Sequence, residues 1–412
     1  RTKRSAAKRG YGNRAVRAWL PIYMSGIFLI ASGRASAEPW SIEPRLGASA
    51  EYGTNPGLRI INPVSEEHVA ALFSLPLRYD ADGIQLFLSP SGRISNSRGY
   101  SSLASNYLHV NGNAQFTNDV GSTSVQGELA RDSSLYYAGA LASGIGVRRD
   151  TALTSADWTR SLTERSLLQL DASWTHVSYA QSANAFGLTD YRYLSAGPTF
   201  GYALTERDTL KVLSSFGLYQ SLNGISESKS ENLQLGFVRQ LNELWSLSTI
   251  AGYSRSTNTQ KYFFGPFFLG NFSSNQNGAV YAATLTRQNE QFSFSGGVSR
   301  SLQPTGFAYL SRQDSFTLNA AYALTERWDF GLSAAWQKVQ NPVLGAPAGS
   351  GTRTNDARFL NVQLTANWHW TPQWIISMHV MRITQQFSPP PVSVASSGVS
   401  LDIVRQFLRF DL

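Results

Sequence analysis

The five histidines are the side chains best suited to chemistry in this sequence, which contains no cysteine. They are His68, His109, His176, His369 and His379. A serine nucleophile needs a base within hydrogen-bond reach, and the stretch HVNGN at 109–113 comes nearest to such a site. No serine motif accompanies it, so we interpret His109 as a polar residue at the end of a strand. We therefore predict no catalytic residue and no enzymatic activity.

Metal and cofactor sites find equally little support. There is no pair of histidines at ligand spacing, no thiolate, and no loop that gathers carboxylates at alternate positions. No glycine-rich motif of the kind that cradles phosphates lies between a strand and a helix. We expect neither a metal nor a cofactor.

The first 37 residues have the pattern of a secretory signal peptide. Residues 1–17 contain seven Lys and Arg and no acid, and the apolar run AWLPIYMSGIFLIASG follows at 18–33. Ala35 and Ala37 then form an A-x-A cleavage site. The alternative is a membrane-spanning helix, but the run is shorter than the roughly 20 residues that a span requires. We predict cleavage after Ala37, and a single domain over 38–412.

This leader accounts for the basic character of the chain. The whole sequence has a net charge of +8, but the residues after 37 contain 27 Lys and Arg against 27 Asp and Glu. A neutral body gives no electrostatic reason to expect nucleic acid as a partner.

The body of the chain alternates between two kinds of residue. In SFTLNAAYALTER (315–327), Phe316, Leu318, Ala320 and Tyr322 share one parity, and small or polar residues occupy the other. Strict alternation over ten or more residues indicates a strand with two different environments. Such strands match the 9–11 tilted residues that cross a bilayer.

The composition of the two faces indicates which medium surrounds them. One face is Leu, Ala, Val, Phe, Trp and Tyr; the other is mainly Ser, Thr, Gly, Asn and Gln. Charged residues make up 15% of the chain, below the ~25% of typical soluble domains. Apolar-out and polar-in alternation is typical of an outer-membrane barrel, which must close because a sheet edge cannot face lipid. The alternative is a soluble β-helix or sandwich.

A repeat of about 40 residues sets the number of strands. YALTER occurs at 202–207 and again at 322–327, with SLTER at 161–165. We predict short turns at 79–83, 117–122, 161–165, 203–207, 241–245, 286–291, 323–327 and 370–374. Eight such turns imply an all-β, antiparallel, up-and-down transmembrane barrel of about 18 strands, with 16 as the second choice. Longer connections are expected at 53–66, 94–102, 133–147, 180–190, 221–229, 258–275, 303–311, 341–356 and 387–396.

Several stretches resemble a known family. They are RRDTALTSADWTRSLTERSLLQLDASWTHVSYA, DYRYLSAGPTFGYALTERDTL, NLQLGFVRQLNELWSLSTIAGYSRS and WSIEPRLGASAEYGTNPGL. They look like the outer-membrane β-barrel porins encoded beside exopolysaccharide or PEP-CTERM gene clusters. The resemblance implies a Gram-negative outer-membrane location and a part in surface-polysaccharide traffic, and it carries over no functional residue. The C-terminal VRQFLRFDL resembles the signal that outer-membrane assembly machinery reads.

A barrel of 16–18 strands leaves an aqueous channel, so polar residues that face inward could select solutes. The alternative is that each merely solvates the channel. The candidates are Asp171, Arg192, Lys211, Gln234, Asp329, Gln363 and His369.

One predicted loop is rich in aromatic residues. In KYFFGPFFLGNF these are Tyr262, Phe263, Phe264, Phe267, Phe268 and Phe272. They could form a constriction or a platform for sugar rings. They could equally pack against neighbouring loops or belong to an aromatic girdle at the membrane interface.

Two classes of function follow from these patterns. The first is a channel that passes or helps export hydrophilic solutes such as surface polysaccharide. The second is a non-conducting structural barrel that docks an export apparatus. Outer-membrane lipid, the assembly machinery, polysaccharide and periplasmic export proteins are the expected partners, after Sec-type export.

Overall fold

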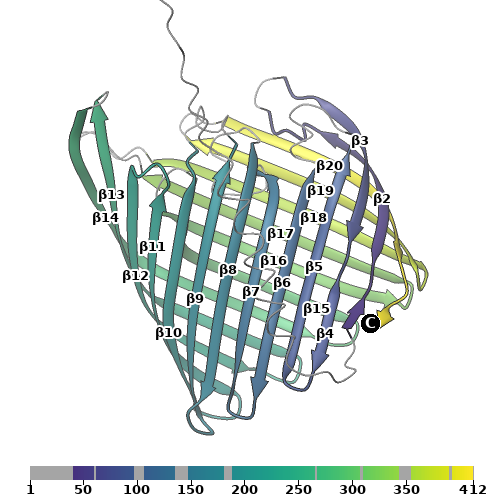
Figure 1. Ribbon diagram of the computed structural model, residues 1–412, viewed down its shortest axis with the longest axis horizontal. Coiled ribbons are helices and arrows are strands. Elements are labelled where there is room, and N and C mark those ends of the chain that lie inside the picture. The colour runs from purple at the N-terminus through teal and green to yellow at the C-terminus, as the bar shows by residue number, and fades with distance from the viewer. Residues whose placement is uncertain are drawn as a thin grey trace, which may run out of the picture. The chain divides into compact units, whose positions relative to one another are not determined.

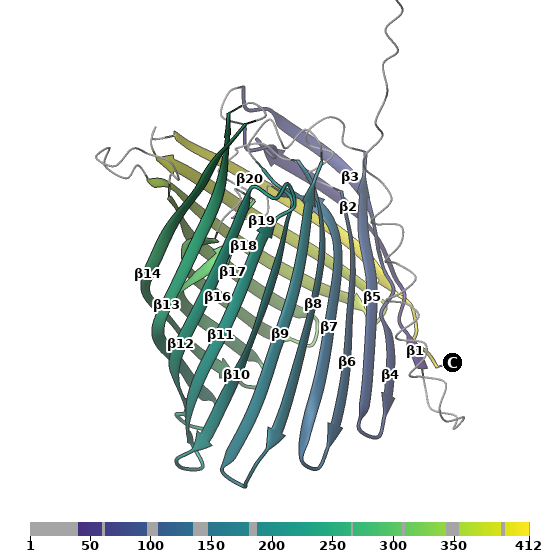
Figure 2. The ribbon, with the colours of Figure 1, turned by 60° about the vertical axis from the view of Figure 1, so that its left-hand side comes forward.

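The computed structural model describes residues 40–59, 62–96, 106–134, 147–180, 188–264, 267–306, 310–342, 354–388 and 392–411. The proposed signal peptide, with Ala35 and Ala37, lies outside this range. Within it the chain forms one antiparallel sheet that closes on itself (Figures 1 and 2).

The strands follow one another around the barrel in chain order. Their bounds are β1 (Trp40–Ile42), β2 (Arg45–Thr54), β3 (Ser65–Ser74), β4 (Leu77–Ala81), β5 (Ile84–Ser95), β6 (Tyr107–Asn118), β7 (Gly121–Ser133), β8 (Arg148–Ser161), β9 (Ser166–Tyr179), β10 (Tyr191–Ala203), β11 (Asp208–Ser221), β12 (Ser226–Gln240), β13 (Trp245–Phe264), β14 (Phe267–Gln288), β15 (Phe292–Pro304), β16 (Leu310–Thr325), β17 (Trp328–Pro342), β18 (Thr354–Thr371), β19 (Trp374–Ser388), β20 (Val392–Gln406) and β21 (Phe410–Asp411).

Three of these strands are continuations of a neighbour. β1 leads into β2, β3 into β4, and β20 into β21 after breaks of two or three residues. β3 and β4 both pair with β5, while β1 pairs with β4 and β21. Counted this way, the barrel has 18 strands, which confirms the predicted fold class.

The first and last strands close the ring. β2 pairs with β20 from Arg45 opposite Gln406 to Thr54 opposite Ser397. Figure 1 shows the purple and yellow ends of the chain meeting at this seam. Closure is physically required because a free edge would leave a row of unpaired N–H and C=O groups in hydrocarbon.

All eight short turns lie where the sequence predicts them, and six of them share a side-chain cap. In the turn between β10 and β11, the Thr205 hydroxyl accepts hydrogen bonds from the N–H groups of Arg207 at 3.2 Å and Asp208 at 3.0 Å. Threonine or asparagine does the same at positions 163, 242, 289, 325 and 371. This side-chain cap explains why the letters LTER recur, because the threonine hydroxyl accepts from the N–H groups two and three residues later and so closes the turn.

Two predicted long connections are wrong. The expected loop at 258–275 is instead the continuation of β13 and β14, which pair from Trp245 opposite Arg287 to Phe264 opposite Phe267. The expected loop at 221–229 shrinks because β12 already begins at Ser226. Neither segment shows the alternation of apolar and polar residues that reveals a strand: 221–229 is largely polar, and 258–275 has aromatic residues at consecutive positions.

Candidate functional site

The two faces of the sheet can be assigned from the cross-strand pairs. Asp171 is opposite Asp157 and Gly197, and together with Ser173, Ser195 and Gln234 they line a recess of about 260 Å³. In β10, residues of the other parity are large and exposed, as at Leu194 and Phe200. No register shift interrupts β2 to β12, so the recess-lining parity marks the inner face and the exposed apolar parity marks the outer face.

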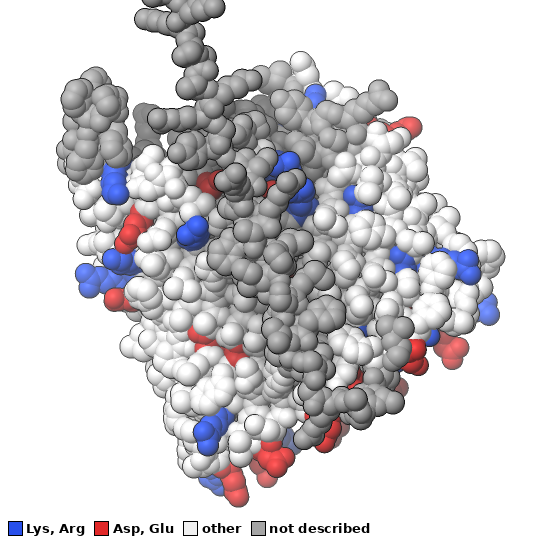
Figure 3. All heavy atoms as spheres, in the orientation of Figure 1, with Lys and Arg blue, Asp and Glu red and all other residues white. Residues whose placement is uncertain are grey.

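The outer face carries an apolar belt of bilayer dimensions. In β13 its members run from Trp245 to Tyr253, where polar Arg255 and Thr257 take over. Nine residues at a tilt of about 45° rise roughly 22 Å, close to the ~25 Å band of membrane barrels. On the side shown in Figure 3, most charged residues lie toward the lower rim and the upper part, and the visible surface between them is mainly white apart from one small acidic patch.

Tryptophans mark the end of the belt at the short turns. Trp328 stacks on Trp368 with ring centroids 5.9 Å apart, and the Arg287 guanidinium lies 5.5 Å from the Trp245 ring centroid. Rings that are apolar in body and polar at one edge favour the boundary between lipid and water. The belt and this girdle fit a membrane-spanning barrel.

Acidic residues predominate on the inner face of β2 to β20. Nine carboxylates and five Lys or Arg side chains have the inner parity. The acids are Glu51, Glu66, Asp80, Glu128, Asp132, Asp157, Asp171, Asp329 and Asp402, and the bases are Arg45, Arg78, Arg93, Arg149 and Lys211.

These charges occupy only part of the wall. From β12 to β16 the inner positions in the described strands contain no Asp, Glu, Lys or Arg. Serine, threonine, asparagine and glutamine take their place, and Ser246, Thr286, Ser295 and Asn319 line a recess of about 610 Å³. The recess also reaches Gln363 of β18, Glu243 of a short turn and Arg287, which has the outer parity. One arc of the lumen is therefore uncharged and rich in hydroxyl and amide groups.

Six of the seven sequence-predicted lining residues have the inner parity. Asp171 and Gln234 share the smaller recess, and Lys211 lies on the same wall, opposite Gly201 and Gly236. Arg192 does not point into the lumen. It has the parity of Leu194 on the outer face, so its assignment as a lining residue is corrected. Polarity alone predicts an inward arginine, but an outer-face arginine near a strand end reaches water beyond the belt.

The other three predicted residues belong to one patch on β17, β18 and β19. The His369 Nε2 atom lies 2.8 Å from a carboxylate oxygen of Asp329, and the Asn367 amide donates to the other oxygen at 2.6 Å. Further along the same strands, Gln363 and Thr365 lie 3.4 and 3.1 Å from Nδ1 of His379.

Sequence reasoning missed the ion pairs that join distant parts of the chain. Arg93 pairs with Glu51 on the inner wall, Arg149 holds Asp132 through two hydrogen bonds of 2.9 and 2.8 Å, and His379 lies 3.4 Å from Asp402. The inner parity of each residue was readable from the sequence. The strand register that brings the partners together was not.

The aromatic segment at 262–272 is a strand hairpin in its backbone, with Phe263 opposite Phe268. The side chains of Tyr262, Phe263, Phe264, Phe267 and Phe268 lie outside the described residues. Phe272 has the inner parity, opposite Gln260, and is exposed. The role of this cluster stays a prediction.

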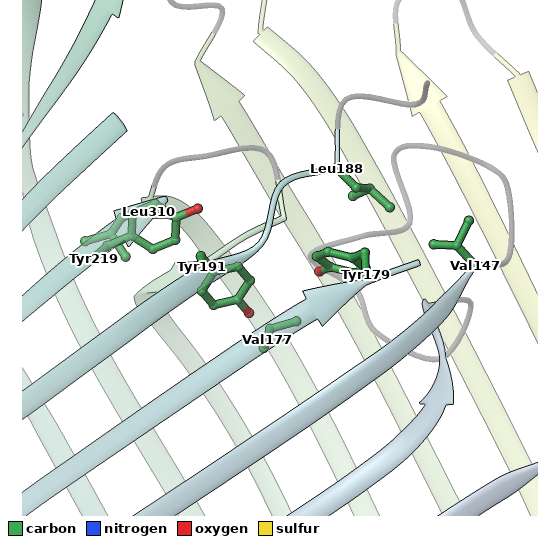
Figure 4. Packing of buried hydrophobic residues seen from close by; sticks show 7 residues of the cluster. All are labelled: Val147, Val177, Tyr179, Leu188, Tyr191, Tyr219 and Leu310. Atoms are coloured by element: carbon green, nitrogen blue, oxygen red, sulfur yellow. The ribbon is translucent and has the colours of Figure 1, made fainter. Parts of the chain in front are cut away.

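Two connections at the end opposite the short turns meet inside the barrel. Between β9 and β10, the Thr189 N–H donates to the Gly306 carbonyl at 2.7 Å, and Gly306 belongs to the connection between β15 and β16. The Tyr219 hydroxyl donates to the Thr305 carbonyl at 3.1 Å. Leu188 and Leu310 are buried with Val147, Val177, Tyr179, Tyr191 and Tyr219 (Figure 4). We call these contacts the loop bridge; it joins walls five strands apart.

Among the described residues, no group of three His, Asp or Glu side chains could hold a metal ion. No helix in the described part of the chain has the length and apolar character to cross a membrane.

Comparison with known proteins gives likeness in fold only. No family model and no curated protein matches the sequence. Solved structures do match over most of the barrel. OccK1 of Pseudomonas aeruginosa has 12% identity, covers 90% of this chain and 99% of its own, and gives a TM-score of 0.44. OccAB4 of Acinetobacter baumannii gives 11% identity, coverage of 89% and 98%, and a TM-score of 0.42.

A structure titled copper transporter OprC has 10% identity and a TM-score of 0.44, with 87% of this chain covered. The match spans 65% of the length of OprC. At these scores the likenesses say nothing about the substrate. The assignment of a closed 18-strand barrel depends on the strand pairing within this chain.

Proposed function

We propose that the protein is a channel of the Gram-negative outer membrane that passes hydrophilic solutes. The observation that carries this proposal is a closed 18-strand wall that is apolar outside and polar, with open recesses, inside. Barrels of this strand number are wide enough to leave an aqueous lumen.

Conductance is the direct test. The folded protein in planar bilayers is expected to give stable ion currents, and liposomes that contain it should swell in small neutral sugars. Protein unfolded before reconstitution is the control. Absence of both current and swelling would exclude the channel.

Within this function we propose surface polysaccharide as a transported solute. The uncharged arc from β12 to β16 supports it, because hydroxyl and amide groups can exchange their water hydrogen bonds for those of sugar hydroxyls. The 610 Å³ recess on this arc is within the ~300–1,000 Å³ range of ligand sites.

A matched pair of variants tests the sugar proposal. Neutral oligosaccharide in the bath should reduce the ion current, and N319A with T286A should weaken that reduction severalfold. N111A removes an amide from the inner face of β6, outside the arc, and should leave the reduction unchanged. Equal loss in both variants would contradict a role of this arc.

A second candidate is a structural barrel that docks an export apparatus without conducting. The loop bridge favours it, because hydrogen bonds between Thr189 and Gly306 and between Tyr219 and Thr305 cross the lumen. Under this alternative, bilayers show no current, and purification from membranes retains periplasmic export proteins.

A further inference from the structure

Four of the five histidines have the inner parity, and each lies beside a carboxylate. The His68 side chain is buried, and those of His109, His369 and His379 are partly exposed. The Nε2 atom of His369 lies 2.8 Å from the Asp329 carboxylate, and that of His379 lies 3.4 Å from Asp402. The Nε2 atom of His68 lies 3.4 Å from Glu66, and that of His109 lies 3.9 Å from Asp132. The fifth histidine, His176, has the outer parity and stacks on Trp174.

The pairs of His369 and His379 lie on β17 to β20 and differ in their surroundings. His379 meets Gln363 and Thr365 of β18 and Asp402 of β20. It also shares a recess with Glu51 of β2 and Arg93 of β5. His369 meets Asp329 of β17, whose other oxygen accepts from Asn367, and it is opposite Ile375 of β19.

The other two pairs have arginines nearby. His68 is opposite Glu51 of β2, which pairs with Arg93 of β5.

His109 contacts the Tyr107 ring and is opposite Ser91 of β5 and Ala130 of β7. Its carboxylate neighbour Asp132 also binds Arg149. Protonation of any of these four histidines would therefore add positive charge next to an existing carboxylate.

The inner carboxylates that have no Lys or Arg partner give the described inner wall its net negative charge. Asp157 and Asp171 are directly opposite each other on β8 and β9, with no Lys or Arg within ion-pair distance among the described residues. Gln169 donates to Asp171 at 2.6 Å. With nine inner carboxylates against five Lys and Arg, the described inner wall has an excess of four negative charges when its histidines are neutral.

We propose that the channel prefers cations to anions near neutral pH, and that its four inner histidines remove this preference on acidification. The proposal rests on the channel function above. A wall of one sign concentrates ions of the opposite sign in a pore. Histidine is the side chain that gains charge between about pH 8 and 5, and four histidines match the excess of four carboxylates.

The zero-current potential across a KCl gradient measures the preference. At pH 8 its sign should be that of a cation-selective pore, and at pH 5 it should move toward zero. A potential of anion-selective sign at pH 8, or one that stays constant between the two pH values, would overturn the proposal. Absence of any current would instead count against the channel itself.

Histidine variants locate the effect. H369Q with H379Q should remove about half of the shift between pH 8 and pH 5. H176Q, which changes the outer-face histidine, should keep the full shift. An equal shift in both proteins, or its loss in H176Q, contradicts the assignment to the inner wall.

Carboxylate variants test the source of the preference. D157N with D171N should lower the ratio of cation to anion permeability at pH 8. D208N removes an outer-face carboxylate near a short turn and should leave the ratio unchanged. If both variants behave alike, the inner carboxylates do not set the selectivity.

Discussion

The hydroxyl of Tyr219 on β11 donates a hydrogen bond to the carbonyl oxygen of Thr305, which precedes β16. These residues are 86 positions apart in sequence, and the contact crosses the inside of the barrel. It ties the connection between β15 and β16 to strand β11, at the end of the barrel opposite the short turns.

Y219F should therefore loosen the loop bridge. One lost hydrogen bond is worth about 1 kcal/mol, which corresponds to roughly a fivefold change between bridged and unbridged populations. We expect higher or more frequently open single-channel conductance. Y253F, on the outer face, is the control and should conduct like the unmodified protein, and an unchanged current in both variants would show that the bridge does not limit passage.

Replacing the turn threonines should destabilise the barrel. In T205V or T325V the N–H groups two and three residues later lose their side-chain acceptor, at a cost of about 1 kcal/mol per turn. Urea unfolding in detergent, followed by tryptophan fluorescence, should show a lower midpoint. T205S retains the hydroxyl and should restore stability, whereas equal stability of T205V and the unmodified protein would contradict the capping role.

Adjacent residues on β12 should respond in opposite ways to the same substitution. Leu235 is 60% exposed on the outer face, and Gln234 has the inner parity. L235R places a charge against lipid and should cost roughly 2–4 kcal/mol near the bilayer centre, visible as reduced assembly into membranes. Q234R should assemble normally and change the conductance; the reverse order of effects would mean that the faces are assigned the wrong way round.

The turn between β4 and β5 should depend on glycine. Gly83 has φ of +73°, and a Cβ there would lie 2.6 Å from the Thr117 carbonyl oxygen. G83A should lower stability by about 1 kcal/mol or more. G331A, where a Cβ would meet Thr365 at an ordinary 3.6 Å, should be nearly neutral in the same unfolding experiment, and comparable losses in both would show that backbone conformation is not the cause.

The sequence alone determined the class of fold and the strand count. Alternation such as Phe316, Leu318 and Ala320 against Thr317 and Asn319 fixes which side faces lipid, since a pleated strand sends successive side chains to opposite faces. The capping threonines at 163, 205 and 325 fix where strands reverse, because the cap is a local interaction. Local chemistry failed where alternation is lost, as in the hairpin around 258–275, and where a charged residue lies on the outer face near a strand end, as at Arg192.

Tertiary structure alone decided which side chains meet. Nothing in the sequence around His379 specifies Asp402, and nothing around Tyr219 specifies Thr305. Such partners depend on the register of each strand pair and on how connections fold into the lumen. The register of each strand pair has to be compatible with all the others, because β2 must pair with β20 to close the barrel. Register is therefore a property of the whole closed barrel, and no single segment determines it.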